Sequence, residues 1–187
     1  MATAKPALSL RGFLRAKRGA TAVEFAMVAL PFFALLFSIL ELGMMFMTAT
    51  TIEASSVSAA RLIRTGQLQA GASNSAAGFK TLICNGMSWI STSDCVSNLS
   101  VDVQTFSSFS AVKVAPPIKN GAIDQTQLTF DAGASCDIVL VQVFYPYSLI
   151  TPLLEPGLPN LNANQRLLTT AVAFRNENWQ VGGSPCS

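Results

Sequence analysis

Residues 25–47, with the sequence FAMVALPFFALLFSILELGMMFM, decide the fold of this chain of 187 residues. All of them are apolar except Pro31, Ser38, Glu41 and Gly43. As a helix, the stretch would span roughly 34 Å, which is enough to cross a hydrocarbon core about 30 Å thick. A buried helix of a soluble protein is the alternative, but the roughly 120 residues of the remaining domain are too few to surround a helix that is apolar on every side. The sequence therefore predicts a transmembrane helix over about residues 24–47.

The charges on the two sides of this stretch predict its orientation. Residues 1–18 hold five basic residues and no acidic residue, namely Lys5, Arg11, Arg15, Lys17 and Arg18. No basic residue follows it before Arg61, so the positive-inside rule places the N-terminus in the cytoplasm and the bulk of the chain outside. A cleaved secretory signal has a similar outline, but this apolar run is about twice as long as the usual one and no convincing cleavage site closes it. We therefore expect the helix to be retained.

Composition excludes several classes of function. The chain has no histidine, which excludes Ser/His/Asp and Cys/His triads and the HExxH zinc site. It also has no glycine-rich phosphate loop. Its net charge of +2 is too small to draw the whole chain to nucleic acid. We expect no enzymatic activity, no cofactor, no metal and no nucleic-acid partner.

Glu24 is the informative residue at the start of the apolar stretch. A carboxylate at the edge of a lipid-facing helix costs about 2 to 3 kcal/mol unless another group compensates it. Cleavage of the chain after Gly19 would give Ala20 a new α-amino group, which is positive at neutral pH. Residues four positions apart share one face of a helix. The amine of Ala20 in one subunit could therefore meet the carboxylate of Glu24 in the next when apolar helices bundle.

This pattern resembles the processing site of a type IV prepilin. The string KRGATAVEF, residues 17–25, has a basic leader, a glycine, four residues, a glutamate and an aromatic residue before the apolar helix. Residues 16–66 are similar to the TadE-like proteins of tight-adherence (Flp) pilus systems. Phe25 stands where many prepilins have tyrosine. The resemblance implies cleavage between Gly19 and Ala20 by a prepilin peptidase, and a minor-pilin or pseudopilin role instead of that of the main filament subunit.

The resemblance also implies a location and partners. We expect a single-pass protein of the bacterial inner membrane with a periplasmic C-terminal domain, and its entry into an extracellular pilus is left open. Its expected partners are membrane lipid, the prepilin peptidase, other pilins or pseudopilins, and the pilus assembly platform. The N-terminal helix is expected to make the last two contacts. An uncleaved membrane protein whose outer domain binds a cell-envelope partner or ligand is the alternative.

Two residues of the apolar stretch are not part of the processing signal. Pro31 removes one helix hydrogen bond, so we expect it to bend the span, and the family pattern also suggests a proline there. Glu41 lies roughly 100° around the helix from Glu24, so the two carboxylates cannot form a catalytic pair. Whether Glu41 is a snorkelling or partner-facing carboxylate or a functional one is left open.

The helix is expected to continue far beyond the membrane. One stripe on it carries Ile52, Ser56, Ala59 or Ala60, and Ile63. Gly66 is the expected stop, so the helix would run from about residue 21 to 65, roughly 65 Å if it is straight. Its outer half must then pack on the globular domain. A periplasmic coiled coil is the alternative, but steady Leu or Ile positions are missing.

The remaining segments predict an α+β domain of the pilin type, in which a second helix packs on an antiparallel sheet. The division is a leader (1–19), the long helix (20–66) and a periplasmic domain (67–187). The expected elements of the domain are a polar linker (67–75), a second helix (76–90), a half-buried strand (99–106), a central strand (138–147) and a closing strand (166–177), with turns within 115–121 and 146–164. The ending Arg175-Asn176-Glu177-Asn178-Trp179 resembles the family's closing Arg-Asn-Glu-Pro-aromatic, with Asn178 in place of the proline.

All four cysteines lie in the part that is expected to face outward, where disulfides can form. None of them is in a CxxC motif, which disfavours a zinc ribbon and a thioredoxin-like role. Three pairings are possible. We favour Cys84 with Cys95, which closes a short loop after a helix, and Cys136 with Cys186, which fixes the C-terminal tail to the sheet.

Overall fold

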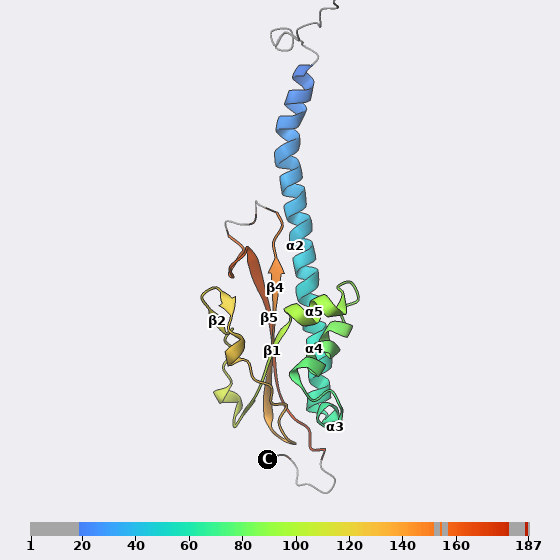
Figure 1. Cartoon of the computed structure of the whole chain (residues 1–187), viewed down its shortest axis with the longest axis vertical. Coiled ribbons are helices and arrows are strands. Elements are labelled where there is room, and N and C mark those ends of the chain that lie inside the picture. Colours follow the sequence, from blue (N-terminus) through green and yellow to red (C-terminus); the bar gives the residue numbers. More distant parts are fainter. Residues whose placement is uncertain (1–18, 152–153, 155–156, 180–185, 187) are drawn as a thin grey trace, which may run out of the picture.

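A long helix projects from a small domain of helices and strands in the computed structural model (Figure 1), which describes residues 19–151, 154, 157–179 and 186. The helix, α2, runs from Ala20 to Arg64 and is continuous through Pro31. The basic leader lies outside the described residues, apart from Gly19. The long helix expected from about residue 21 to 65 is therefore confirmed.

The end of α2 and its buried stripe follow the sequence pattern. Gly66 has φ +76, in the left-handed region that favours glycine, and ends the helix. The predicted stripe is buried: at most 3% of each residue is exposed for Ile52, Ser56, Ala59, Ala60 and Ile63. The outer half of α2 thus packs on the domain as expected.

The shorter helices differ from the prediction. The second helix, α4, covers Ala76–Asn85 and stops short of residue 90, and a further helix, α5, covers Thr92–Asn98. A Cβ added to Gly86 would lie 2.5 Å from the Ser55 Oγ atom, so this glycine allows the end of α4 to touch α2. The linker 67–75 also contains a single helical turn, α3, at Gln67–Ala70. The segments Gln67–Ala70 and Thr92–Asn98 carry too few apolar residues to show a periodicity.

The sheet has the predicted centre. Strand β4, Ile138–Ser148, lies between β1, Ser100–Phe106, and β5, Gln165–Arg175, in the order β1-β4-β5, and both pairings are antiparallel. Val141 faces Val103 on β1 and Val172 on β5. The α+β class with helices packed on an antiparallel sheet is therefore confirmed.

Pro146 belongs to both the expected strand 138–147 and the expected turn region 146–164, and the structure places it inside β4, where it pairs with Leu167 of β5. The pairing of β1 with β4 ends at Ser100 and Phe144. Beyond that point one edge of β4 has no strand partner among the described residues, and proline tolerates an edge position because it has no N–H to donate. The other expected turn, 115–121, overlaps a small hairpin of β2, Ile118–Lys119, and β3, Ala122–Ile123.

The main core lies between the helices and one face of the sheet (Figure 1). Its fully buried members include Ile63, Phe79, Ile83, Val141 and Val143. On strand β1 the polar residue Asp102 is 4% exposed. Its carboxylate accepts hydrogen bonds from the backbone N–H and the hydroxyl of Thr129 at 2.9 and 3.0 Å. The long connection from β1 to β4 therefore covers this part of the second face of the sheet.

The two disulfides have the pairing favoured above. Cys84–Cys95 joins α4 to α5, and its two residues are 0% exposed. Cys136–Cys186 ties the tail to the connection that leads into β4. Both lie in the domain, beyond the exposed part of α2.

Candidate functional site

The N-terminal part of α2 leaves the domain (Figure 1). Its apolar side chains are exposed. Phe25 is 71% exposed, and Met27 and Leu30 are each 75% exposed. The most apolar window of the helix has a mean hydropathy of 2.3. An apolar surface of this length requires an apolar environment. This is one candidate membrane-spanning helix, and it fits a membrane protein.

The residues of the expected processing site lie at the tip of this helix. Gly19 directly precedes the first helical residue, Ala20, and has φ −93. A Cβ added to Gly19 would meet no atom within 4 Å. Neither packing nor backbone conformation therefore requires glycine at this position. Glu24, one turn after Ala20, is exposed, as is Phe25. Cleavage between Gly19 and Ala20 stays a prediction.

Glu41 has a partner that the sequence did not indicate. Only 3% of this residue is exposed, although it lies in the most apolar stretch of the chain. Its carboxylate accepts hydrogen bonds from the backbone N–H of Ile150 and, at 2.7 Å, from that of Thr151. A buried carboxylate must be satisfied by donors, and these two amides serve that purpose. Of the readings left open, snorkelling is thus wrong, and the partner is a turn of the same chain.

The burial of α2 begins well inside the range expected to cross the membrane. Ser38 is 5% exposed, Met45 is 9% exposed and Thr48 is 0% exposed. The hydroxyl of Ser38 donates to the carbonyl of Ala34 at 2.7 Å, and that of Thr48 donates to the carbonyl of Met44 at 2.8 Å. From Ser38 onward, one side of the helix is therefore covered by the domain.

Two polar residues face each other across β4 and β5 near this junction. Tyr147 pairs with Arg166 in the register, and both are half-buried. Burial raises the pKa of Tyr147, and the nearby charges of Glu41 and Tyr145 raise it further. The guanidinium of Arg166 donates to the carbonyl of Leu158 at 3.1 Å.

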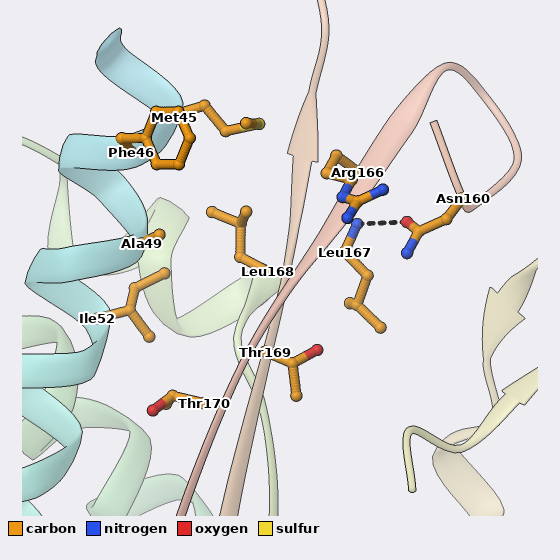
Figure 2. A pocket seen from close by; sticks show the side chains of 10 residues that line it. All are labelled: Met45, Phe46, Ala49, Ile52, Asn160, Arg166, Leu167, Leu168, Thr169 and Thr170. Atoms are coloured by element: carbon orange, nitrogen blue, oxygen red, sulfur yellow. Dashed lines mark hydrogen bonds between the residues drawn. The ribbon is translucent and has the colours of Figure 1, made fainter. Parts of the chain in front are cut away.

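A cavity of about 410 Å³ separates α2 from the start of β5 (Figure 2). Met45, Phe46, Ala49 and Ile52 of the helix line one side. Residues 166–170 and Asn160 line the other, where the Asn160 side-chain oxygen accepts a 2.7 Å hydrogen bond from the backbone N–H of Leu167. No carboxylate or thiol is among the lining residues. The described part of the chain also has no group of three or more metal-ligating side chains.

The closing motif fastens the other end of α2. Arg64 forms a 2.9 Å salt bridge with Glu177 and accepts a 2.8 Å hydrogen bond from its backbone N–H. Asn176 is 1% exposed, and its amide donates to the carbonyls of Ala132 and Ala134 at 3.0 and 2.9 Å. A Cβ added to Gly66 would lie 2.5 Å from the ring of Trp179. The motif therefore fixes the helix end to the sheet.

Residues 19–61, which make up most of α2, match the family model of TadE-like proteins. The match confirms the resemblance to TadE-like proteins for this helix. No curated protein and no solved structure matches the chain.

Proposed function

We propose that this chain is a minor pilin or pseudopilin needed for the assembly of a tight-adherence pilus, and that it is processed by a prepilin peptidase between Gly19 and Ala20. The observation that carries the proposal is the projecting, exposed, apolar half of α2, which falls within the segment matched by the TadE-like family. An inner-membrane location, with the N-terminus in the cytoplasm and the domain in the periplasm, follows from the basic leader. The two disulfides suit an oxidising compartment.

The mechanism is lateral association of apolar helices, with no catalytic step by this chain. The exposed side chains of α2 pack against the helices of other pilins or pseudopilins and of the assembly platform. Glu24 is the exception to the apolar surface, and it would be costly to bury alone. The new α-amino group of Ala20 on a neighbouring subunit neutralises it. Peptidase cleavage thereby creates the charge that makes helix packing favourable.

The attachment of the domain to α2 suits this role. The hydrogen bonds of Glu41 attach the domain to α2 at the end that is nearer the membrane. The contacts of Arg64 attach the domain to the outer end of the helix. A domain fixed at both places moves with the helix as one body. Helix packing in the membrane then sets the position of the domain in the assembly.

The test is a pair of glycine variants of the full chain in its native host. Gly19→Val should block cleavage and leave the leader on the protein. Gly43→Val is the matched control, because a Cβ at Gly43 also meets no atom within 4 Å. This control should mature like the wild type, with Ala20 as the first residue, as read by intact mass and N-terminal sequencing.

Two results would contradict the proposal. Maturation of Gly19→Val to an Ala20 terminus would show that the glycine does not specify cleavage. Retention of residues 1–19 in the membrane-extracted wild type would favour the uncleaved anchor whose outer domain binds a cell-envelope partner.

A further inference from the structure

The turn that follows β4 lies beside the middle of α2, at the end of the domain that faces the projecting helix (Figure 1). We infer that the first residues of this turn, 149–151, with the exposed Ile150 at their centre, are a second membrane contact, which rests on the outer surface of the bilayer that α2 crosses. The inference requires α2 to span a membrane. It does not depend on peptidase cleavage or on a role in a pilus.

Ile150 is exposed although its backbone is fixed. Its side chain is 80% exposed, whereas its backbone N–H donates to the carboxylate of Glu41. The preceding residue, Leu149, is 7% exposed and exchanges hydrogen bonds with Asn164 at 3.1 and 3.2 Å. The next residue, Thr151, also donates to Glu41. The neighbours on both sides thus hold the turn in place while the isoleucine points outward.

The position of the turn along α2 corresponds to the outer surface of a bilayer that the helix crosses. From Glu24 to Glu41 the helix rises roughly 25 Å, and a hydrocarbon core is about 30 Å thick. With the basic leader in the cytoplasm, Glu24 lies near the inner boundary of that core. Glu41 and the turn that it holds then lie near the outer boundary. An exposed isoleucine at this depth meets acyl chains instead of water.

The surface around the turn has the composition of a membrane interface. Ile150 and Thr151 border an apolar groove whose helix side is formed by Ala34, Phe37, Leu40 and Met44. This groove is continuous with the exposed apolar surface of α2, because Phe37 and Leu40 are 56% and 54% exposed. The surface that α2 offers to lipid therefore extends onto the domain at the turn.

Tyr147 and Arg166 lie farther out than Ile150 along the two strands. Tyrosine is enriched at membrane interfaces, where its ring is apolar and its hydroxyl reaches water. Arginine snorkels in the same way and offers five donors, of which the contact with Leu158 engages one nitrogen of Arg166. Going outward from the membrane, isoleucine comes first, and tyrosine and arginine follow. This order suits a bilayer, in which the acyl chains are followed by the headgroups.

The experiment uses the full chain in nanodiscs that hold one copy each. The four native cysteines are paired, so Ile150→Cys introduces the only thiol for an environment-sensitive fluorophore. Leu40→Cys serves as the reference inside the membrane. Val57→Cys, 50% exposed and farther out on the same helix, is the reference in water. Quenching by lipids that carry a nitroxide near the headgroup is measured for all three.

The label at Ile150 should be quenched at least about threefold more strongly than the label at Val57, because roughly 24 Å of helix separates Val57 from the level of Glu41. Its emission should resemble that of the Leu40 label. Quenching at Leu40 but not at Ile150 would overturn the inference and leave the membrane helix intact. Absence of quenching at Leu40 would overturn the membrane span itself, and the second contact with it.

A second copy of the chain is the competing occupant of the groove. Discs loaded with two copies distinguish it from lipid. The label at Ile150 could instead be shielded only in discs with two copies and not be quenched by lipid. That result would assign the turn to a subunit contact and overturn the inference. Equal lipid quenching with one and two copies is the expected result.

Discussion

The carboxylate of Glu41 accepts a 2.7 Å hydrogen bond from the backbone N–H of Thr151, which lies 110 positions further along the chain. The same carboxylate accepts a second hydrogen bond from Ile150. At the other end of the contact between helix and domain, Arg64 meets Glu177 at 2.9 Å. Polar contacts therefore hold α2 to the domain near both ends of the part of the helix that the domain covers.

Glu41→Leu should release the turn after β4. The substitution leaves two amide donors without an acceptor, at a cost of about 1 to 3 kcal/mol of stability. Hydrogen exchange at Ile150 and Thr151 should accelerate, as measured by mass spectrometry in nanodiscs. Glu41→Gln keeps one oxygen acceptor and should give a smaller effect. Unchanged protection of both amides in Glu41→Leu would contradict the contact.

Glu24→Gln should impair assembly without impairing membrane insertion. The neutral amide removes the charge that we expect to pair with the amine of Ala20, and we expect piliation to fall by about tenfold or more. Glu53→Gln is the matched control, because Glu53 is also an exposed carboxylate on α2 but lies beyond residues 24–47, which are expected to cross the membrane. Pilus counts and membrane fractionation are the measurements. Wild-type piliation with Glu24→Gln would show that the carboxylate is dispensable.

Both tyrosines of the chain should titrate above their ordinary range in the folded protein. Burial raises the pKa of Tyr145 and of Tyr147 above 10.0, and negative charges nearby add to the effect. In the unfolded chain both phenols lose their protons near pH 10. The folded state therefore binds more protons above that pH, and its stability falls as the pH rises through the raised values.

The shift is measured by following tyrosinate absorbance as a function of pH, once for the native protein and once for the protein in denaturant. Tyr147→Phe should halve the amplitude and reduce the loss of stability at high pH. A native titration that coincides with the denatured one would refute the shift.

Asn176→Ala should destabilise the domain more than Glu177→Ala does. Asn176 is 1% exposed and its loss leaves two carbonyls without their amide donor, at a cost of about 1 to 3 kcal/mol. The side chains of the Arg64–Glu177 pair are 54% and 50% exposed, so breaking this ion pair should cost below about 1 kcal/mol. Thermal unfolding followed by circular dichroism compares the two variants. A larger loss for Glu177→Ala would reverse this ranking.

Sequence patterns predicted elements where one local period persists over many residues. The apolar run and the stripe from Ile52 to Ile63 predicted α2, and the β-prone run 138–147 predicted the central strand. The same reasoning extended α4 too far and missed α5, because Thr92–Asn98 has little apolar content and is held by the disulfide of Cys95. It also left Pro146 in the overlap of the predicted strand 138–147 and the predicted turn 146–164. The strand tolerates this proline because the pairing of β1 with β4 ends at Phe144, which no local pattern indicates.

The sequence by itself determined the long helix, its glycine stop, the strand at the centre of the sheet and the prepilin-like tip, because each is encoded by neighbouring residues. Only the tertiary structure decided what Glu41 does. Its apolar surroundings required a partner, but the amides that satisfy it belong to a turn more than 100 positions away and have no side-chain signature. Packing of the sheet against α2 brings Glu41 and these amides together, and no local sequence pattern indicates this contact.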